Sequence, residues 1–292
     1  MPAAPLATAT VPSRAALAGN PSDGYGGAVV SVDVPAFAAS VEIREHSGDE
    51  PVPLIATTLR RFSLDVAPVD GLTATFESTI PRSVGLAGSS AIVIATLAAL
   101  GEATGSALEA DQIAQLAHMV ERVDLGIAGG WQDQIIQSRG GPLLMEFAEP
   151  MRQERLPSPI APLFVAWTTE ASEDSGVSHA ELRARETEVA ASMADLADVA
   201  RSAAEALRAG STHELKAAMN ATFGLRRAVM PIDPLHGAMI DTARSLGAAC
   251  NFAGSGGAIV GVVPKDAVAF EAGVQEAGLE LTMWNPGDDG NG

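Results

Sequence analysis

The stretch that decides the fold is "PRSVGLAGSSAIVIATLAAL", residues 81–100. Its apolar second half predicts a buried helix that begins near Ser89 and ends at Gly101 or Gly105. The glycines before it permit backbone conformations that other residues resist. Because the first N–H groups of a helix have no partner within the helix, they bind anions well. The stretch therefore has two interpretations: a serine that caps a core helix, or a backbone cradle for phosphate.

Composition restricts the class of protein. The chain has 292 residues, of which 47% are hydrophobic and 18% charged, as is typical of a globular protein long enough for two domains. No apolar run reaches the roughly 18 residues of a membrane-spanning helix. The first residues, "MPAAPLATATVPSR", lack the basic and apolar regions of an export signal, so we expect a short tail. A single cysteine, Cys250, excludes an internal disulfide and favours the cytoplasm.

The charge is strongly acidic. The formal net charge of −18 repels nucleic acids and anionic membranes, so neither is an expected partner. An anionic substrate would need local basic residues that act against this field. The arginines are therefore the candidates for contacts with an anion.

The order of elements predicts an α+β fold. Short β-like runs lie within 13–66, and "GLTATFEST" (71–79) and "GGPLLMEF" (140–147) are further strands. The amphipathic segment 108–123 predicts a helix. A cluster of prolines from Pro150 to Pro162 marks a domain boundary, giving domains 1–150 and 151–292.

The second half mixes strands and helices without a repeated βα period. "LFVAWT" (163–168), the two runs of "CNFAGSGGAIVGVV" (250–263) and "LELTMW" (279–284) predict strands. Alanine- and leucine-rich segments predict helices at about 177–209, 212–229, 234–247 and 265–277.

Three further motifs accompany the glycine-serine stretch. "LAGNPSDGYGG" (17–27) is rich in turn residues, and "ERVDLGIAGGWQDQ" (121–134) carries Glu121 and Asp133 around a glycine turn. "FAGSGGA" (252–258) is a second glycine-rich segment. In this order the motifs resemble those of the GHMP kinases, the superfamily of galactokinase, homoserine kinase, mevalonate kinase and phosphomevalonate kinase. The resemblance covers nearly the whole chain.

The resemblance implies a two-domain fold. The N-terminal, nucleotide-binding domain would be like domain 2 of ribosomal protein S5, and the C-terminal domain would be a ferredoxin-like α+β domain. The central motif of the superfamily usually reads P-x-x-x-G-L-G-S-S-A, and here it is one residue longer before the serines. That spacing, with "LAGNPSD", "WQDQIIQSRGGPLLMEF" and "FGLRRAVM", is most similar to the glucuronokinases, which phosphorylate glucuronate at its anomeric hydroxyl.

The resemblance also implies the parts of an ATP-dependent kinase with Mg²⁺. The expected contacts to the ATP phosphates are Gly85, Ala87, Gly88, Ser89 and Ser90. Ser90 and Glu121 offer the hard oxygen donors that Mg²⁺ prefers. Asp133 matches the proposed catalytic base, and Arg14 matches a basic residue near the transferred phosphoryl group. Glu121 could instead pair with Arg122, and Asp133 could be an ordinary surface carboxylate.

Substrate contacts are implied as well. The expected residues are Asp23, Tyr25, Asp133, Ser255, Gly256, Arg226 and Arg227. Adjacent helical residues diverge by about 100°, so only one of the two arginines would bind a carboxylate. Arg82 and Arg139 are alternatives for that contact. Trp131 either lines the sugar site or packs in the core, and the histidines show no ligand spacing.

Three hypotheses remain open. The first is a cytoplasmic kinase, monomer or homodimer, that phosphorylates the anomeric hydroxyl of a uronic acid. The second keeps the fold and changes the acceptor to galactose, a heptose phosphate or a mevalonate-like alcohol. The third is a catalytically silent ligand-binding protein, which has no reason to keep Ser90, Glu121, Asp133 and Arg14 together.

Overall fold

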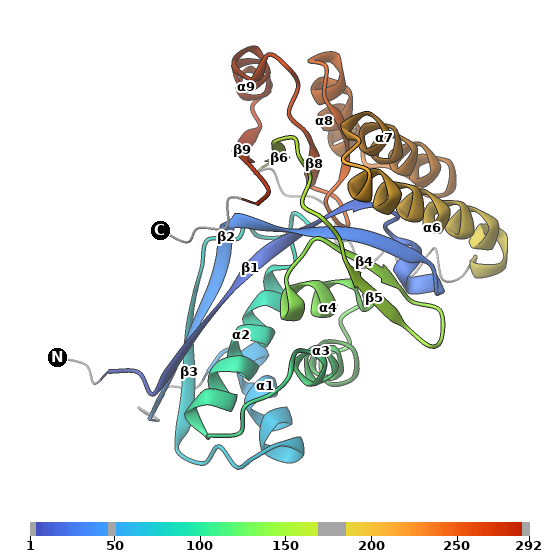
Figure 1. Cartoon of the computed structure of the whole chain (residues 1–292). Helices are drawn as coiled ribbons and strands as arrows, with labels where there is room; N and C mark the ends of the chain where they lie inside the picture. The colour runs from blue at the N-terminus through green and yellow to red at the C-terminus, as the bar shows by residue number, and fades with distance from the viewer. Residues whose placement is uncertain (1–3, 46–50, 169–184, 288–292) are drawn as a thin grey trace. The chain divides into compact units, whose positions relative to one another are not determined.

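The computed structural model describes residues 4–45, 51–168 and 185–287 (Figure 1). The strands are β1 Ala7–Ala18, β2 Ala28–Glu45, β3 Leu72–Ser78, β4 Leu143–Glu146, β5 Arg152–Arg155, β6 Leu163–Trp167, β7 Ala249–Phe252, β8 Ala258–Val262 and β9 Glu280–Trp284. The α-helices are α1 Pro53–Asp65, α2 Gly88–Ala103, α3 Ala110–His118, α4 Gln132–Arg139, α6 Glu186–Arg208, α7 Thr212–Val229, α8 Pro234–Ser245 and α9 Ala267–Glu276. A short 3₁₀ turn, η1, covers Ser22–Tyr25, and a π-helical turn, η2, covers Met119–Asp124.

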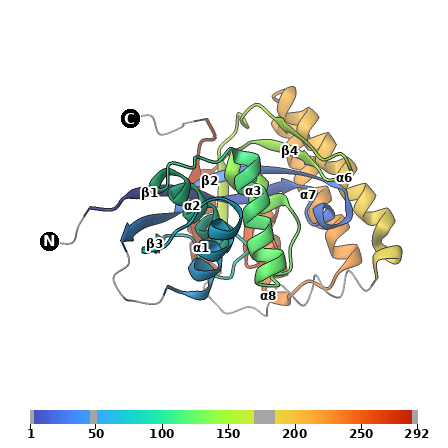
Figure 2. The same cartoon turned by 90° about the horizontal axis from the view of Figure 1, so that it is seen from below.

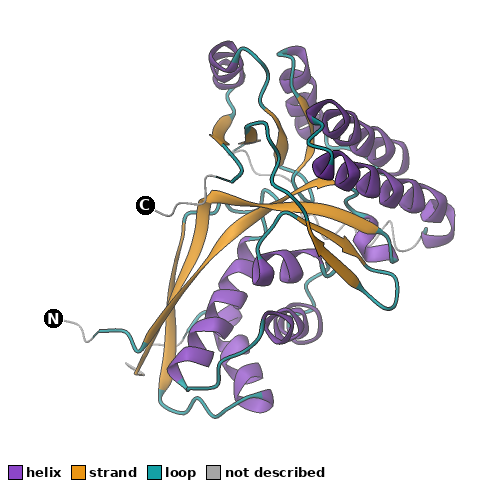
Figure 3. Cartoon of the chain, viewed as in Figure 1, coloured by secondary structure: helices purple, strands orange, loops and turns teal. Residues whose placement is uncertain are grey.

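Two sheets confirm the predicted α+β class (Figure 3). The first has the order β1-β2-β4-β5, with β3 also paired to β2. The second has the order β7-β8-β6-β9. The pairs β2–β3, β2–β4 and β4–β5 in the first sheet, and all three pairs in the second, are antiparallel.

The chain forms two compact units, each assembled from separate stretches. Unit 1 contains 1–13, 33–81 and 87–140, and unit 2 contains 14–32, 82–86 and 141–292. These units divide the chain differently from a single boundary at residue 150, because β1 and β2 each contribute residues to both. The domains 1–150 and 151–292 stay a prediction.

Unit 1 is built around α2. Over residues 91–100 helix α2 is buried on almost every side, as expected for a helix that is apolar all round. Helix α2 contacts α1, α3, α4 and β3. Figure 1 draws α1 to α4 together on the same side of β3. The predicted helix after Ser89 is confirmed, and its true first residue is Gly88.

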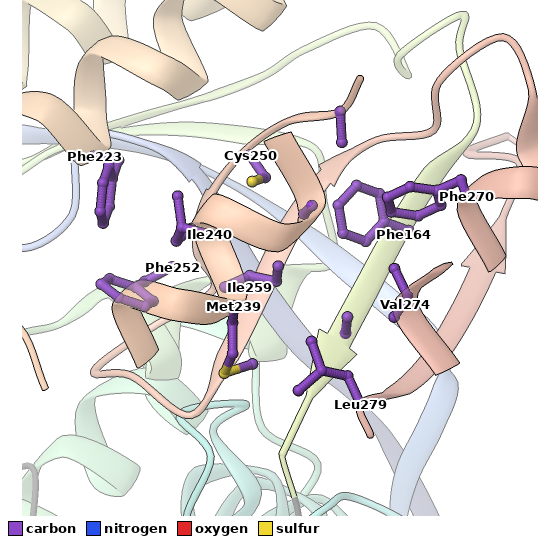
Figure 4. Close-up of a cluster of buried hydrophobic side chains, with 13 residues drawn as sticks. Phe164, Phe223, Met239, Ile240, Cys250, Phe252, Ile259, Phe270, Val274 and Leu279 are labelled. Carbon is purple, nitrogen blue, oxygen red and sulfur yellow. The ribbon is translucent and has the colours of Figure 1, made fainter. Parts of the chain in front are cut away.

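In unit 2 a hydrophobic core packs on the second sheet. Buried side chains from β6, β7, β8 and helices α7, α8 and α9 meet there, among them Phe164, Phe252 and Phe270 (Figure 4). Phe164 and Phe270 pack with ring centroids 4.7 Å apart. Helices α6 and α7 contact each other along their lengths and lie side by side in both Figure 1 and Figure 2.

Several local predictions need correction. Residues 53–65 were grouped with β-like runs, yet they form α1. Their buried residues Ile55, Thr58, Leu59 and Phe62 follow the helical spacing, and Pro53 occupies the first helical position. The β-like residues from 28 to 45 form one long strand, because β2 continues through an exposed Pro35. That proline lies between the parts of β2 that pair with β4 and with β3, where it costs neither ladder a hydrogen bond.

The remaining elements mostly agree with the sequence. Helices α7, α8 and α9 and strands β3, β4, β6, β7, β8 and β9 lie where they were predicted. The predicted helix 177–209 is confirmed from residue 186, and residues 177–184 lie outside the described residues. Helix α4 and strand β5 were not predicted. Within the described ranges, no helix is both long and apolar enough to pass through a lipid bilayer.

Candidate active site

The start of α2 leaves backbone donors uncapped. The N-cap residue is Ala87, which adopts a left-handed conformation with φ 57°, and along the described chain no side chain accepts a hydrogen bond as its cap. Ser89 and Ser90 lie inside the first turn of the helix, so the interpretation of a capping serine is wrong. The first N–H groups of α2 are therefore available to an anion at the positive end of the helix dipole.

Both serine hydroxyls donate to one buried carboxylate. Ser89 Oγ lies 2.9 Å from Glu121 Oε1, and Ser90 Oγ lies 2.7 Å from Glu121 Oε2. Glu121 is 3% exposed and lies in the π-helical turn η2, a type of turn that is frequent at functional sites. Gln134 Nε2, on α4, donates to the same Oε2 at 2.5 Å. Three donors therefore hold this carboxylate, and Glu121 does not pair with Arg122 as the alternative interpretation proposed.

Burial raises the pKa of Glu121, and the negative charge of Asp133 raises it further, while the three hydrogen bonds lower it. A buried carboxylate of this kind gains from a nearby cation. In the part of the chain that the structure describes, no three His, Cys, Asp or Glu side chains gather as metal ligands. This donor set fits Mg²⁺, which is commonly bound by one or two carboxylates together with substrate phosphates.

Helix α4 supplies residues that sequence reasoning missed. Gln137 is buried, and its Nε2 donates to the carbonyls of Pro12, at 2.9 Å, and Ala87, at 3.2 Å. One turn earlier Gln134 holds Glu121. The helix therefore ties the N-cap of α2 to the buried carboxylate. The signal in the sequence is the spacing of Gln134 and Gln137, because residues three positions apart lie on the same face of a helix.

Asp133 lies in the first turn of α4 and is half-buried. It lies near enough to Glu121 for its charge to affect that carboxylate. Trp131, just before α4, stacks on His118 with ring centroids 3.6 Å apart. Burial lowers the pKa of His118 to about 4, so this imidazole is neutral at pH 7. Trp131 thus packs against His118 and is half-buried, and its place beside the sugar stays a prediction.

In unit 2, Arg14 binds backbone. It is 5% exposed, and its Nη1 donates to the carbonyls of Gly85 and Ala253, both at 2.8 Å. The segment 84–86 and the loop 253–257 also pack closely. A Cβ on Gly85 would come within 2.8 Å of the nitrogen of Ser255, and one on Gly257 within 2.9 Å of the Cα of Val84. Glycine is required at both positions by this approach and by their positive φ.

The two arginines of "LRR" differ in environment. Arg226 is buried, with 4% exposure, and donates from Nη1 to Asn20 Oδ1 and the Gly254 carbonyl and from Nη2 to the Ser255 carbonyl. Arg227 is exposed. Of the alternative arginines, Arg139 pairs with Asp111 at the surface, whereas Arg82 is exposed in the segment before α2.

The remaining predicted substrate residues also lie in unit 2. Asp23 and Tyr25 belong to η1 and are half-buried. Tyr25 packs against the cluster formed by Val189, Met193 and Leu196, and the charge of Asp23 acts on Arg226. Ser255 and Gly256 lie in the turn between β7 and β8.

Comparison with known proteins relates the chain to one family of kinases. Residues 53–141 match the sequence model of the family described as "GHMP kinases N terminal domain". Over these residues the chain is similar to the GHMP kinases. The related proteins carry the names of small-molecule kinases.

The curated relatives include two from Arabidopsis thaliana. "Probable glucuronokinase 2" is 34% identical over 216 residues, which cover 66% of this chain and 57% of that protein. "Glucuronokinase 1" is 29% identical over 309 residues, covering 87% of this chain and 84% of that protein. A D-glycero-alpha-D-manno-heptose 7-phosphate kinase of Campylobacter jejuni is 44% identical over 70 residues, covering 24% of this chain and 21% of that protein. The chain thus spans little more than half the length of the first of these relatives.

Solved GHMP kinases share the fold. The Streptococcus pneumoniae phosphomevalonate kinase, solved in complex with phosphomevalonate and AMPPNP, superposes with a TM-score of 0.81 at 14% identity, covering 95% of this chain and 99% of that chain. The Methanococcus jannaschii mevalonate kinase gives 0.76 at 17% identity, covering 96% and 98%. The predicted α+β, GHMP kinase-like fold is confirmed.

Proposed function

We propose that the protein is an ATP-dependent kinase that phosphorylates the anomeric hydroxyl of a uronic acid, with glucuronate as the first candidate. One observation carries the proposal: the uncapped N-terminus of α2 lies one turn from a buried carboxylate held by Ser89, Ser90 and Gln134. A phosphate-binding helix start next to a ligand for a hard cation is what phosphoryl transfer requires. The glucuronokinase relatives support the choice of acceptor.

In this proposal the backbone of Gly85, Ala87, Gly88, Ser89 and Ser90 binds the ATP phosphates. Glu121 and the hydroxyl of Ser90 are the ligands offered to Mg²⁺, which when bound neutralises charge on the phosphates. Gln134 keeps the Glu121 carboxylate in place. The Gln137 contact with the Ala87 carbonyl keeps the helix start in place.

Asp133 would align the anomeric hydroxyl and accept its proton. An anomeric hydroxyl is more acidic than an ordinary alcohol, so alignment contributes more than full proton removal. Arg14 would act through its charge near the transferred phosphoryl group, since its Nη1 is already bound to two carbonyls. Asp23 would hold substrate hydroxyls, beside Tyr25, Ser255 and Gly256.

The acceptor carboxylate needs a cation, because the net charge of −18 disfavours an anionic sugar. Arg226 and Arg227 are the predicted contacts. The Arg226 guanidinium already donates to Asn20 and two backbone carbonyls, so the exposed Arg227 and Arg82 are the first to test. Replacing the arginine that binds the carboxylate with leucine should lower kcat/KM for glucuronate far more than for glucose.

The test of the function is ADP release from ATP and Mg²⁺ with a panel of acceptors. The panel contains glucuronate, galacturonate, glucose, galactose, a heptose phosphate and mevalonate. We expect glucuronate to exceed glucose by about 100-fold in kcat/KM, because a site built to bind a charged group rejects the analogue that lacks it. Phosphorus NMR of the product checks that the phosphate is on the anomeric carbon.

Equal turnover of glucose would contradict the uronic acid and leave a broader sugar kinase. The second candidate, a heptose-phosphate kinase, is favoured by the Campylobacter relative and would show as preferential turnover of that acceptor. No ADP release with any acceptor would favour the silent ligand-binding protein. We also propose a cytoplasmic enzyme, because its single cysteine forms no internal disulfide.

A further inference from the structure

The π-helical turn η2, which carries Glu121, depends on contacts from other elements. It follows α3 without a break and contains an i to i+5 bond, from the N–H of Leu125 to the carbonyl of Val120 at 3.0 Å. Beyond it the N–H of Ile127 donates to the Glu121 carbonyl at 2.8 Å. Such turns are rare and occur mostly as single turns within α-helices. We therefore expect contacts outside the turn to select this conformation over a regular helix.

One set of contacts binds the Glu121 side chain. Its carboxylate accepts hydrogen bonds from Ser89, Ser90 and Gln134. The Ser90 hydroxyl and the Glu121 carboxylate are also the ligands proposed for Mg²⁺, so the bond between them must rearrange when a cation binds. That bond cannot fix the turn in both states. A second attachment that involves neither ligand would keep the turn in place throughout.

The second attachment is a two-bond ion pair between Arg61 of α1 and Asp124, the last residue of η2. Arg61 Nε donates to Asp124 Oδ2 at 2.9 Å, and Arg61 Nη2 donates to Asp124 Oδ1 at 2.5 Å. The two side chains are only 14% and 12% exposed. These bonds lower the pKa of Asp124 and raise the pKa of Arg61, so both groups are charged at pH 7. Two parallel bonds of this kind fix the orientation of the groups as well as their distance.

Arg61 is held on its own helix as well. Its Nη1 donates to Asp65, one turn later in α1, at 3.1 Å. Helix α1 packs on α2, whose first turn carries Ser89 and Ser90. Through Arg61, α1 therefore joins the end of η2 to the helix that begins at the two serines. This connection restrains Glu121 relative to the serines without any bond to its carboxylate.

We propose that Arg61 is a positioning residue, which acts through Asp124 to hold η2 with the Glu121 carboxylate directed at the start of α2. The proposal rests on the proposed kinase function for one point, the use of Glu121 as a ligand to Mg²⁺. Replacing a residue that orients a metal ligand from outside the ligand set commonly changes metal affinity or activity by about 10- to 100-fold. Lysine is a poor substitute for Arg61, because it lacks the planar fork that meets both carboxylate oxygens.

Arg61→Lys tests the proposal, with Arg208→Lys as the matched control. Arg208, on α6, has the same bonding pattern: Nε and Nη2 donate to the two oxygens of Glu154, at 3.0 and 2.7 Å, and Nη1 donates to Glu205 on its own helix at 2.6 Å. That pair ties α6 to β5 and involves no residue of the candidate site. The measurements are hydrogen exchange of the peptide covering 118–127, melting temperature, and the affinity for AMPPNP by calorimetry with and without Mg²⁺.

We expect only Arg61→Lys to raise hydrogen exchange in residues 118–127, by about tenfold, because local opening of the turn becomes easier. It should also weaken the binding of AMPPNP with Mg²⁺ by about tenfold, at the lower end of the range for residues outside the ligand set. The affinity for AMPPNP without Mg²⁺ should stay nearly unchanged, which a general loss of structure would not produce. Arg208→Lys should change neither the exchange of this peptide nor the two affinities.

Unchanged exchange in residues 118–127, or equal losses of AMPPNP affinity with and without Mg²⁺, would overturn the proposal. If Arg61→Lys does not fold, Asp124→Asn weakens the same pair from the other side and should show the same rise in exchange and the same Mg²⁺-dependent loss. The absence of both changes in that variant would equally overturn the positioning role.

The positioning role and the kinase function fail separately. If the wild-type protein phosphorylates no acceptor, the kinase function is wrong, and the hydrogen exchange of η2 in the protein alone still decides whether Arg61 holds the turn. If wild type is an active kinase and Arg61→Lys behaves like Arg208→Lys, only the positioning role is wrong.

Discussion

At the scale of single residues, two neighbouring carboxylates have different environments. Glu121 is buried and accepts hydrogen bonds from two serines and a glutamine, whereas Asp133 is half-buried at the start of α4. Burial raises the pKa of Glu121. In the proposed kinase these environments suit different tasks, with Glu121 as ligand to a cation and Asp133 as the group that meets the acceptor hydroxyl.

Asp133→Asn should abolish most turnover while leaving ATP and sugar binding largely intact. An aligning base acts in the transition state, so the loss belongs in kcat and KM changes little. Steady-state kinetics and calorimetry measure the two effects. A variant that no longer binds the sugar would reassign Asp133 to substrate binding.

Ser90→Ala should lower turnover by about 10- to 1,000-fold, by analogy with removal of one preorganised group. The loss of Oγ also removes a hydrogen bond to Glu121. Ser138→Ala is the control, because Ser138 Oγ donates to the carbonyl of Gln134 one turn earlier. Near-normal activity of Ser90→Ala at saturating Mg²⁺, measured by ADP release, would contradict the proposed role of Ser90 as a Mg²⁺ ligand.

At the scale of elements, the turn between β7 and β8 depends on close packing with helix α8. Gly256 has φ 146°, and a Cβ there would lie 2.8 Å from Nδ1 of His236, a buried residue of α8. Burial lowers the pKa of His236, so its imidazole favours the neutral form. The turn therefore tolerates no side chain at this position, for reasons of both conformation and space.

Gly256→Ala should cost about 1–3 kcal/mol more stability than Gly278→Ala, since only the first adds a steric clash to the strain of a positive φ. A Cβ on Gly278, whose φ is 76°, meets no described atom within 4 Å. Denaturant unfolding of both variants gives the two free energies. Equal losses would show that His236 moves away at little cost.

At the scale of the whole molecule, the net charge of −18 acts on every anionic reactant. Salt screens charges that are separated by more than about 8–10 Å near physiological ionic strength. A local arginine is screened less because it lies close to its anion. The long-range repulsion and the local attraction thus respond differently to salt.

Raising NaCl from about 20 to 200 mM should lower the KM for glucuronate by about twofold or more at saturating ATP, because screening weakens the repulsion. The KM for glucose, a neutral sugar, should stay nearly constant. Because both KM values are measured with the same protein at saturating ATP, their comparison removes the effects of salt on ATP binding and on the stability of the fold. A KM for glucuronate that rises with salt would mean that local basic residues dominate the field.

The sequence by itself determined the features that local pattern encodes. The apolar run 91–100 specified the buried helix α2, and the glycines before it specified the loop at its start. Alternation and spacing likewise located most strands of the second sheet, because residues on one face of an element recur with its own period. The order of motifs was enough to indicate the resemblance to the GHMP kinases, whose N-terminal domain model matches residues 53–141.

Only the tertiary structure decided which side chains meet. Gln137 reaches Pro12, 125 positions away, and Arg226 reaches Asn20, 206 positions away. No local period encodes such contacts. The sequence marked Arg226 and Arg227 equally, but their burial differs. Arg226 is buried and donates to Asn20 and to two backbone carbonyls, whereas Arg227 is exposed. The reason is physical, since a buried guanidinium must find acceptors within the fold, and those acceptors come from distant segments of the chain.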